Sequence, residues 1–422
     1  MILLSHPTGN QNVREALRAL DEVGGLESFV TSIAAGGGNW FDRLSRLPGG
    51  GEFNRRRFDA RLMAKAHLHP QRELMRLATQ RLGWRAPSRH EAGPFSVDRI
   101  YQTIDAATAD RVRKSGGRLT GVYAYEDGAL ATFAAAREAG LLCWYDLPIG
   151  YWRVARRIQS EEAERLPEWA GTMPALADSE AKLARKDDEL RLAERILVAS
   201  RFTAETLKEA PFDLPVPQVI PYGCPPTPRD FTRPPGQPDR PLRALFVGGL
   251  SQRKGLSYLF DAVESLKGAC ELTVIGRRPA TTCAPLDAAL ARHRYLPSLP
   301  HHEILREMER HDVLVFPSLF EGFGLVVTEA LSRGLPVITT PHTCGPDVLD
   351  EGRDGFVVPI RDSAAIAGRL ETLHRDRGLL NDMSRAALGK AAELTWQRYR
   401  QALAAAVVNA PPARIPEASC HE

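Results

Sequence analysis

Short apolar runs, separated by longer amphipathic stretches, make up the first half of the chain. The apolar runs are typical of buried strands, and the stretches between them are typical of helices. The predicted strands are Ile2–Ser5, Ser28–Ile33, Arg99–Ile104, Thr120–Tyr125, Leu141–Tyr145 and Ile196–Ser200, and the predicted helices are Val13–Leu20 and Ala129–Ala139. Strands that alternate with helices indicate a parallel sheet covered by helices on both faces.

The same alternation begins again in the second half, where it is more regular. The predicted strands there are Arg243–Val247, Glu271–Ile275, Val313–Phe316, Val337–Thr339 and Phe356–Val358. The predicted helices are Leu256–Leu266, His302–Arg310, Val326–Ser332, Ser363–His374, a segment after Leu380, and Thr395–Val408. This pattern predicts a second doubly wound α/β domain, whose ligand would lie beyond the carboxyl ends of the strands.

A proline-rich segment separates the two halves. Residues 210–242 are so crowded with prolines that a long helix or a central strand is excluded there. Because one core rarely grows beyond roughly 250–300 residues, a chain of 422 residues is expected to form two domains. We predict a first domain over residues 1–215, a second over residues 216–392, a terminal helix over residues 393–410, and a flexible tail over residues 411–422.

The composition is that of a soluble globular protein. Apolar residues make up 43% of the chain and charged residues 25%, and the formal net charge of +3 is too small to indicate nucleic-acid binding. The six cysteines form no C-x-x-C pair and none lies near histidines at zinc-ligand spacing, which favours a reducing compartment and no metal site. Neither a signal peptide nor a run of ~20 apolar residues is recognisable, so we expect a cytoplasmic protein.

One segment of the first domain is strongly basic. Between Arg55 and Arg89, basic residues are interleaved with apolar ones, and only Asp59 and Glu73 oppose them. An amphipathic basic segment favours contact with an anionic membrane surface, here the inner face of the membrane, or with a phosphorylated acceptor. The alternative is an ordinary solvated helix face in an arginine-rich chain.

The run Glu321-Gly-Phe-Gly-Leu-Val-Val-Thr-Glu329 carries the strongest chemical signal. It follows the predicted strand Val313–Phe316, and its glycines allow a ligand to approach the backbone closely. The helix after the glycines would direct its free N–H groups at an anion such as a diphosphate. A carboxylate in the loop can accept hydrogen bonds from sugar hydroxyls, and one within the helix can hold the hydroxyls of a ribose.

Residues 242–362 resemble the donor domain of the family-4 retaining glycosyltransferases. The E-x7-E pattern of that family is matched by Glu321 and Glu329. Its other motifs are matched, in order, by Val219-Ile-Pro-Tyr-Gly223, Lys254-Gly255, Ile275-Gly276, Pro317-Ser318 and Gly334-Leu-Pro-Val337. The resemblance implies the GT-B fold, in which two Rossmann-like doubly wound α/β domains face a cleft and the terminal helix crosses back to the first domain.

The resemblance also implies roles for single residues. Lys254 would neutralise the diphosphate as the nucleotide leaves, Glu321 would hold hydroxyls of the donor sugar, and Glu329 would hold the ribose. The remaining donor-binding candidates are the backbone at Gly249, Gly276, Gly322, Phe323, Gly324 and Leu325, and Leu299 near the base. Fixed cations and N–H dipoles would stabilise the charge on the departing diphosphate.

The chain departs from the family pattern at three places. Gly249 stands where the family has an arginine, and Arg253 is the candidate to replace it. Near the N-terminus, the loop with Gly9 and Asn10 stands where relatives carry a glycine pair. After Tyr125 the histidine expected near the reacting sugar is missing.

Three carboxylates are therefore candidates for an acceptor-side base. They are Glu126 and Asp127, directly after Tyr125, and Asp146 at another strand end. The alternative role for each is helix capping or turn formation, since Asp127-Gly128 is a good turn signal.

The favoured hypothesis is a retaining hexosyltransferase. It would move a hexose from a nucleotide-diphosphate sugar to a glycan or lipid-linked acceptor, in polysaccharide or glycoconjugate synthesis. The chain has no D-x-D motif and no G-x-G-x-x-G, so neither a metal nor another cofactor is predicted. The alternative is an inactive GT-B protein that binds a nucleotide or a glycan. A glycosidase would need two carboxyl groups about 5–10 Å apart, and nothing in the sequence places Glu321 and Glu329 on one cleft wall.

Overall fold

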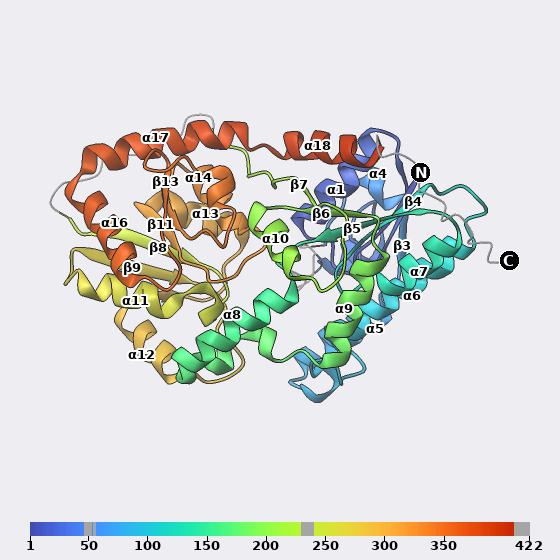
Figure 1. Cartoon of the computed structure of the whole chain (residues 1–422), viewed down its shortest axis with the longest axis horizontal. Helices are drawn as coiled ribbons and strands as arrows, with labels where there is room; N and C mark the ends of the chain where they lie inside the picture. The colour runs from blue at the N-terminus through green and yellow to red at the C-terminus, as the bar shows by residue number, and fades with distance from the viewer. Residues whose placement is uncertain (46–52, 54–55, 229–239, 409–422) are drawn as a thin grey trace.

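The chain folds around two parallel β-sheets that lie side by side (Figure 1). The structure is a computed structural model, and it describes residues 1–45, 53, 56–228 and 240–408. The first sheet has seven strands and the second has six. The fold class predicted from the sequence is therefore confirmed.

The first sheet is built from the N-terminal half. Its strands are β1 (Ile2–Ser5), β2 (Leu26–Thr31), β3 (Ala66–Leu68), β4 (Gly121–Tyr125), β5 (Leu142–Leu147), β6 (Arg195–Val198) and β7 (Gln218–Val219). The α-helices of this half are α1 (Gln11–Glu22), α2 (Trp40–Ser45), α4 (Ala60–Met63), α5 (Gln71–Arg81), α6 (Val97–Arg113), α7 (Leu130–Glu138), α8 (Trp152–Arg165), α9 (Glu180–Leu192) and α10 (Arg201–Thr206).

The second sheet is built from the C-terminal half. Its strands are β8 (Leu242–Val247), β9 (Cys270–Ile275), β10 (Arg294–Leu296), β11 (Val313–Phe316), β12 (Val337–Thr339) and β13 (Gly355–Val357). The α-helices are α11 (Leu256–Ser265), α12 (Ala284–Arg292), α13 (His301–Arg310), α14 (Leu325–Leu331), α15 (Gly345–Val348), α16 (Ser363–Arg375), α17 (Arg377–Glu393) and α18 (Trp396–Val408).

Strand order gives each sheet a point where the winding direction reverses. The first sheet runs β3-β2-β1-β4-β5-β6-β7 and the second runs β10-β9-β8-β11-β12-β13. In both sheets the first strand of the unit lies next to the fourth, with Leu3 paired to Val122 and Leu245 paired to Leu314. Ligands of doubly wound sheets bind at this reversal, outside the carboxyl ends of the strands. The β1/β4 and β8/β11 ends are therefore the places to look for a site.

Alternate residues of the first sheet face different layers of helices. Leu3 and Val122 pack in one core cluster with Ile104 of α6, whereas Leu4 and Tyr123 pack in another with Leu17 of α1. The period of two follows from the pleat of a strand. Both faces are apolar because helices cover both, which is why these strands read as continuous apolar runs.

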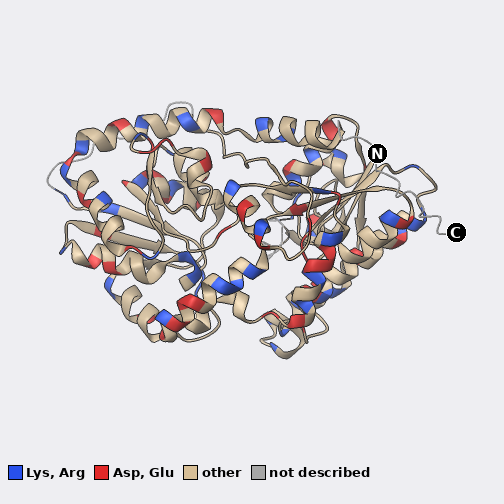
Figure 2. Cartoon of the chain, viewed as in Figure 1, with Lys and Arg blue, Asp and Glu red and all other residues tan. Residues whose placement is uncertain are grey.

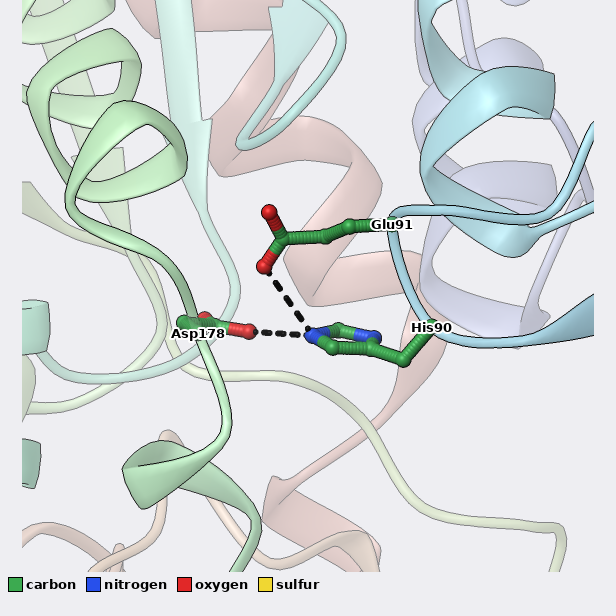
Figure 3. A group of neighbouring side chains, drawn as sticks. All are labelled: His90, Glu91 and Asp178. Carbon is green, nitrogen blue, oxygen red and sulfur yellow. Dashed lines mark hydrogen bonds and ion pairs between the residues drawn. The ribbon is translucent and has the colours of Figure 1, made fainter.

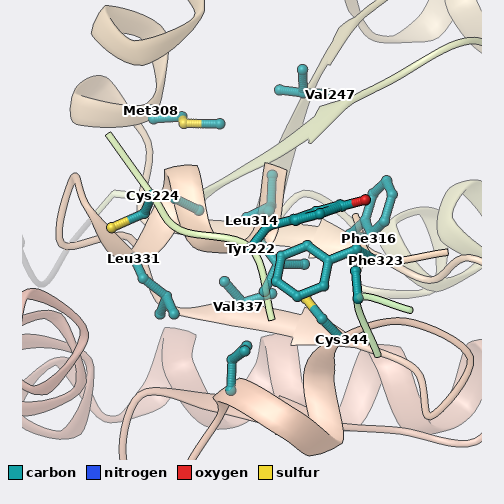
Figure 4. Close-up of a cluster of buried hydrophobic side chains, with 14 of the residues drawn as sticks. Tyr222, Cys224, Val247, Met308, Leu314, Phe316, Phe323, Leu331, Val337 and Cys344 are labelled. Atoms are coloured by element: carbon teal, nitrogen blue, oxygen red, sulfur yellow. The ribbon is translucent and has the colours of Figure 1, made fainter. Parts of the chain in front are cut away.

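The core of the second domain also receives side chains from the segment that enters it. Figure 4 shows Tyr222 and Cys224 of that segment among Leu314 and Phe316 of β11, with Phe323 nearby. The rings of Tyr222 and Phe323 lie 5.1 Å apart between centroids. The entry segment is thus packed directly against the loop that carries the E-x7-E pattern.

Several segments tie the two halves together. Helix α18 lies beside α1 (Figure 1), and Arg400 of α18 pairs with Glu15 of α1 at 2.7 Å. A 3-10 turn at Pro167–Thr172, which follows α8, packs on α12, and Trp169 in that turn stacks with Phe260. The halves therefore meet both along α18 and along α8 with the turn that follows it.

One predicted strand of the first half is wrong. Arg99–Ile104 lies inside helix α6, where the Ser96 hydroxyl accepts a hydrogen bond from the backbone N–H of Arg99 at 3.2 Å and caps the helix. Ile100, Ile104 and Thr108 are buried at a spacing of four residues, which is helical. The six residues of the predicted strand are too few for this helical period to be recognised. The elements α8, α9, α12 and β10 were not predicted from the sequence.

Candidate functional site

The reversal point of the second sheet is closely packed around glycines. Gly255 has a φ of +71°, and a Cβ there would lie 2.1 Å from the carbonyl oxygen of Pro317, which follows β11. A Cβ on Gly276, which follows β9, would lie 1.7 Å from the carbonyl oxygen of Gly248. These two positions require glycine because the ends of β8, β9 and β11 converge there. Gly249, by contrast, faces open space.

Two basic side chains meet the predicted sugar-binding carboxylate at this point. They belong to a 3-10 turn at Gln252–Lys254, directly before α11. The Lys254 ammonium contacts Oε2 of Glu321, and Nη1 of Arg253 lies 3.3 Å from the same oxygen. Arg253 also donates a hydrogen bond to the carbonyl oxygen of Phe320 at 2.6 Å. The structure therefore brings the three residues predicted as catalytic into one contact group.

The environment of this group favours binding an anion. Burial, followed by the nearby charge of Arg253, lowers the pKa of the Lys254 ammonium. Burial likewise lowers the pKa of the Arg253 guanidinium to about 10. Burial therefore disfavours both positive charges, and a diphosphate placed beside them would stabilise the charged forms.

The glycine loop after Glu321 is held by the first half of the chain. A Cβ on Gly322 would lie 1.9 Å from the carbonyl oxygen of Pro148. The hydroxyls of Ser200 and Thr203 both donate to the carbonyl oxygen of Gly322, the latter at 2.9 Å. Gly324, with a φ of +86°, ends the loop and α14 begins at the next residue. The loop is therefore fixed from both sides.

A cleft of about 1110 Å³ lies between the two halves. Gly9 and Asn10 line it from the first half, and Leu299, Leu325 and Glu329 line it from the second. Five of the predicted site residues are thus brought to one cavity. Arg253, Lys254 and Glu321 do not line this cleft and form their own contact group at the β8/β11 reversal.

The predicted ribose-binding carboxylate has a partner in the cleft. Nε2 of His301 lies 2.9 Å from Oε1 of Glu329, and both residues line the cavity. This hydrogen bond raises the pKa of His301. The contact with His301 involves one of the two carboxylate oxygens of Glu329. The sequence predicts no site role for His301, which begins α13.

Two of the candidate acceptor-side carboxylates, Glu126 and Asp127, lie in the turn that follows β4. Glu126 pairs with Lys186 at 3.1 Å, and Asp127 lies 3.5 Å from Arg185, so both are tied to α9. Burial raises the pKa of Glu126, and the Lys186 charge works against that shift. Asp127 has a φ of +71°, and its backbone N–H donates to Glu189 at 2.9 Å. This geometry favours the turn interpretation for both residues, and neither lines the cleft.

Asp146 lies in a buried polar cluster at the carboxyl ends of β4 and β5. Its Oδ2 accepts a hydrogen bond from the Tyr123 hydroxyl at 2.7 Å. Burial raises the pKa of Asp146 to about 7, although the hydrogen bond from Tyr123 opposes the shift. The carboxyl group can therefore exchange a proton near neutral pH. It is only 3% exposed, so a base role would require the acceptor to reach it through the tyrosines.

A histidine with no recognisable motif in the sequence lies beside this cluster. His6 follows β1, and its ring is 4.9 Å from that of Tyr125 between centroids. Its Nδ1 accepts hydrogen bonds from the backbone N–H groups of Thr8 and Gly9, both at 3.1 Å, so the neutral ring carries its proton on Nε2. Burial lowers its pKa to about 3. His6 thus lies beside the carboxyl end of β4, although it follows β1 in the sequence.

His6 also shapes the loop that lines the cleft. Gly9 has a φ of +62°, and a Cβ there would lie 2.2 Å from the ring of Phe58. The Thr8 hydroxyl donates to Oδ1 of Asn10 at 3.1 Å. The loop with Gly9 and Asn10 is thus held by His6 on one side and by Phe58 on the other.

A group of possible metal ligands lies elsewhere on the first half. Figure 3 shows His90, Glu91 and Asp178, with Nε2 of His90 lying 2.9 Å from Asp178 and 3.2 Å from Glu91. The ammonium of Lys182 lies 3.1 Å from the same Asp178 oxygen, and Glu91 accepts a hydrogen bond from the backbone N–H of Ser179 at 2.9 Å. The group therefore connects two loops through contacts that need no metal.

Part of the chain is similar in sequence to known proteins. Residues 229–390 match the family described as glycosyl transferases group 1. The amylovoran biosynthesis glycosyltransferase AmsK of Erwinia amylovora is 30% identical over 179 residues, which are 36% of this chain and 44% of AmsK. The chain thus spans less than half the length of this curated relative.

Solved structures match over nearly the whole chain. Sucrose-phosphate synthase from Thermosynechococcus elongatus aligns with a TM-score of 0.66 and 16% identity, covering 97% of this chain and 98% of that one. The Anabaena protein Alr3699/HepE in complex with UDP-glucose aligns with a TM-score of 0.61 and 16% identity, covering 97% and 99%. At such identities the matches show a shared fold, which is the two-domain GT-B arrangement.

Proposed function

Starting from the membership of residues 229–390 in the glycosyl transferases group 1, we propose that the chain transfers a hexose from a nucleotide-diphosphate sugar, with retention of configuration. The observation that carries this proposal is the contact group of Arg253, Lys254 and Glu321 at the β8/β11 reversal. In this group two basic side chains contact one carboxylate, at the position where doubly wound sheets bind ligands, which supports a sugar-binding role for Glu321.

In the proposed mechanism the cations act on the leaving group. Lys254 and Arg253 stabilise the negative charge that develops on the diphosphate as the bond to the sugar breaks. Glu321 then accepts hydrogen bonds from the donor sugar, and Glu329 accepts them from the ribose. Because the two side chains supply the required positive charge, the proposal includes no metal ion and no other cofactor.

Lys254 and Glu321 contact each other directly. We propose that the diphosphate replaces the Glu321 carboxylate as the partner of Lys254 when the donor binds. Glu321 is thereby released to the sugar. The same contact motivates the second candidate, an inactive nucleotide- or glycan-binding protein, because a permanent Lys254–Glu321 pair would exclude the diphosphate.

The acceptor in this proposal is a glycan or a lipid-linked glycan. AmsK, by its name, acts in the biosynthesis of amylovoran, and HepE was solved with UDP-glucose. These relatives support a role in polysaccharide or glycoconjugate synthesis and make UDP-sugars the first donors to test.

A thermal-shift screen tests the donor assignment. We expect one of the UDP-, GDP- or ADP-sugars to stabilise the purified chain, by about 2.7 kcal/mol at 100 times its dissociation constant. The matching nucleoside monophosphate, which lacks the second phosphate, should stabilise it much less because Lys254 and Arg253 then lose their ligand. If no nucleotide sugar shifts the transition, the transferase proposal fails. If one does but the chain releases no nucleoside diphosphate with any acceptor, the binding protein is favoured.

We also propose peripheral contact with an anionic membrane through the C-terminal end of α5, the inner face if the chain is cytoplasmic. Leu82 and Trp84 follow α5 with 65% and 63% of their surfaces exposed, and Arg81 and Arg85 flank them. Figure 2 shows that acidic and basic residues are otherwise interspersed over both halves. Among the described residues, no helix has the length and apolar character that crossing a membrane requires.

Cosedimentation with vesicles tests this contact. The chain should sediment with vesicles that contain anionic lipid, and the double variant Leu82→Ser/Trp84→Ser should lose most of that binding. Val216→Ser is the matched control, since Val216 is 92% exposed and distant in sequence from α5. Equal sedimentation of all three proteins would contradict the proposal.

A further inference from the structure

The wall of the cleft contributed by the first half is rich in arginine. Arg14 and Arg18 of α1 and the consecutive Arg56 and Arg57 all line the cavity. Asp59 and Glu329 are the carboxylate side chains among the described residues that line it. This arginine wall, defined as Arg14, Arg18, Arg56 and Arg57, faces a cavity that also contains the predicted ribose-binding residue.

The carboxylates that hold the wall are mostly buried behind it. Glu15 contacts Arg18 and also pairs with Arg400 at 2.7 Å. Glu73 contacts Arg56 and also pairs with Arg76 at 2.6 Å. Both glutamate side chains are 2% exposed, and neither lines the cavity. Each of these buried carboxylates is shared by two arginines, which orients the guanidinium groups. Arg18 also pairs with Asp59 at 2.7 Å, and Arg57 lies 3.4 Å from Asp42, so part of the wall's positive charge is offset within the fold.

One guanidinium group of the wall lacks a full set of partners. Arg56 is 6% exposed, and its Nη1 has no hydrogen-bond partner within the part of the chain that the structure describes. A buried N–H donor without an acceptor costs stability, and because Arg56 lines the cleft, an anionic oxygen bound there is a candidate partner for it.

The backbone around the wall is well fixed. The N–H of Ala35 donates to the carbonyl oxygen of Arg56 at 2.8 Å. The N–H of Phe58 donates to the carbonyl oxygen of Ala35, also at 2.8 Å. Nη1 of Arg14 donates to the carbonyl oxygen of Gly9 at 2.8 Å. Arg14 is therefore held by the loop that brings Gly9 and Asn10 to the cleft, and the backbone of Arg56 is held by Ala35.

We propose that the arginine wall binds a phosphate group of the acceptor, so that the acceptor is a phosphorylated compound. The inference rests on the proposed transfer function, because it assigns the first-domain side of the cleft to the acceptor. Several guanidinium forks suit the multiple oxygens and charge of a phosphate or diphosphate better than a neutral glycan. Binding there holds the acceptor beside the donor, which lowers the entropic cost of their meeting.

Calorimetric titration of the full chain with inorganic pyrophosphate tests the wall. The donor site around Lys254 also binds pyrophosphate in the proposed function, so two binding events are expected. The double variant Arg18→Gln/Arg57→Gln should weaken one of them about ten- to a hundredfold. Lys254→Met should weaken only the other. Arg113→Gln is the matched control, because Arg113 is 55% exposed, as Arg57 is 54% exposed, and does not line the cleft.

The readouts separate this inference from the proposed function. Stabilisation by the nucleotide sugar should be unchanged in Arg18→Gln/Arg57→Gln, a result that a merely structural loss would not give. If pyrophosphate binding remains sensitive to the arginines while no nucleotide sugar binds, the anion site stands and the donor assignment fails. If Arg18→Gln/Arg57→Gln binds pyrophosphate as the wild type does, the inference is overturned.

Further titrations identify the source of the phosphate. Tighter binding of farnesyl diphosphate than of pyrophosphate supports a lipid-linked acceptor, and tighter binding of glucose 6-phosphate supports a soluble sugar phosphate. Both outcomes require the loss of affinity in Arg18→Gln/Arg57→Gln. If that variant loses binding only to anionic vesicles and to none of these compounds, the wall contacts a membrane and the inference fails.

Discussion

Replacing Lys254 with methionine is expected to slow the release of nucleoside diphosphate from the donor by about 100- to 1,000-fold. This is the usual cost of removing one group that stabilises developing negative charge. Methionine keeps most of the length of the side chain, and its apolar end can still pack near Phe316, whose ring centroid lies 4.7 Å from the Lys254 nitrogen. The change therefore removes the charge and little else. The rate is measured with the donor that gives the thermal shift.

Comparison with other variants shows whether the effect belongs to the site. Lys208→Met removes an exposed lysine of the first half, 73% exposed beside Glu205, and should leave the rate unchanged. Glu321→Gln should also slow the reaction, since the amide is a weaker acceptor for sugar hydroxyls. A loss of less than tenfold in Lys254→Met would mean that the diphosphate is neutralised elsewhere and would remove the main support for the proposed mechanism.

Much of the second domain was predictable because its signals are local. The strands β11 and β12 have the predicted bounds, Val313–Phe316 and Val337–Thr339. Glycines at Gly255 and Gly276 are required by backbone approaches of about 2 Å or less at their Cβ positions. Because packing requires glycine at these two positions, the motifs Lys254-Gly255 and Ile275-Gly276 could be recognised from the sequence alone.

The acceptor side was harder to predict because its contacts join distant segments. His6 reaches Tyr125 only because β1 pairs with β4, and that pairing is not encoded in either segment alone. The arginine wall combines α1 with Arg56 and Arg57, whereas the sequence showed only the basic run from Arg55 to Arg89. Arg55 itself lies outside the described residues. Strand order and tertiary pairing supplied what local patterns could not.

The contact between α8 and the Lys254 turn was also hidden from the sequence. Glu162 of α8 is fully buried, and three side chains of the second half converge on its carboxylate. Its Oε1 accepts hydrogen bonds from Nε2 of Gln252 at 2.8 Å and from the Tyr258 hydroxyl at 2.9 Å. Its Oε2 accepts one from Nε of Arg361 at 2.8 Å. Because Gln252 belongs to the turn that carries Arg253 and Lys254, Glu162 is a positioning residue for the predicted diphosphate site.

Replacing Glu162 with glutamine is expected to lower the stability of the chain by about 3 kcal/mol. An amide cannot accept all three hydrogen bonds, and one of its N–H groups must face a donor. Breaking a buried ion pair by removing one partner costs about 3–5 kcal/mol. The lower end applies because Arg361 also pairs with Glu161 at 3.0 Å. Urea unfolding, followed by circular dichroism, measures the change.

The neighbouring Glu161 provides a matched control on the same helix. Its side chain is 42% exposed and pairs with the same Arg361, so Glu161→Gln should cost less than about 1 kcal/mol. Hydrogen exchange gives a second readout at the turn. The backbone N–H of Gln252 donates to the Thr172 hydroxyl at 2.9 Å, and that of Ser257 donates to the Gln252 side chain at 3.0 Å. Both amides should exchange faster in Glu162→Gln than in Glu161→Gln.

The effect on the donor distinguishes positioning from simple support of the fold. If Glu162 orients the turn, Glu162→Gln should weaken nucleotide-sugar binding even under conditions where the chain is fully folded. Pyrophosphate binding at the arginine wall should stay unchanged, because Glu162 contacts none of its residues. If Glu161→Gln destabilises the chain as much as Glu162→Gln, or if both amides keep their protection in Glu162→Gln, the turn is held by other contacts and α8 has no part in shaping the site.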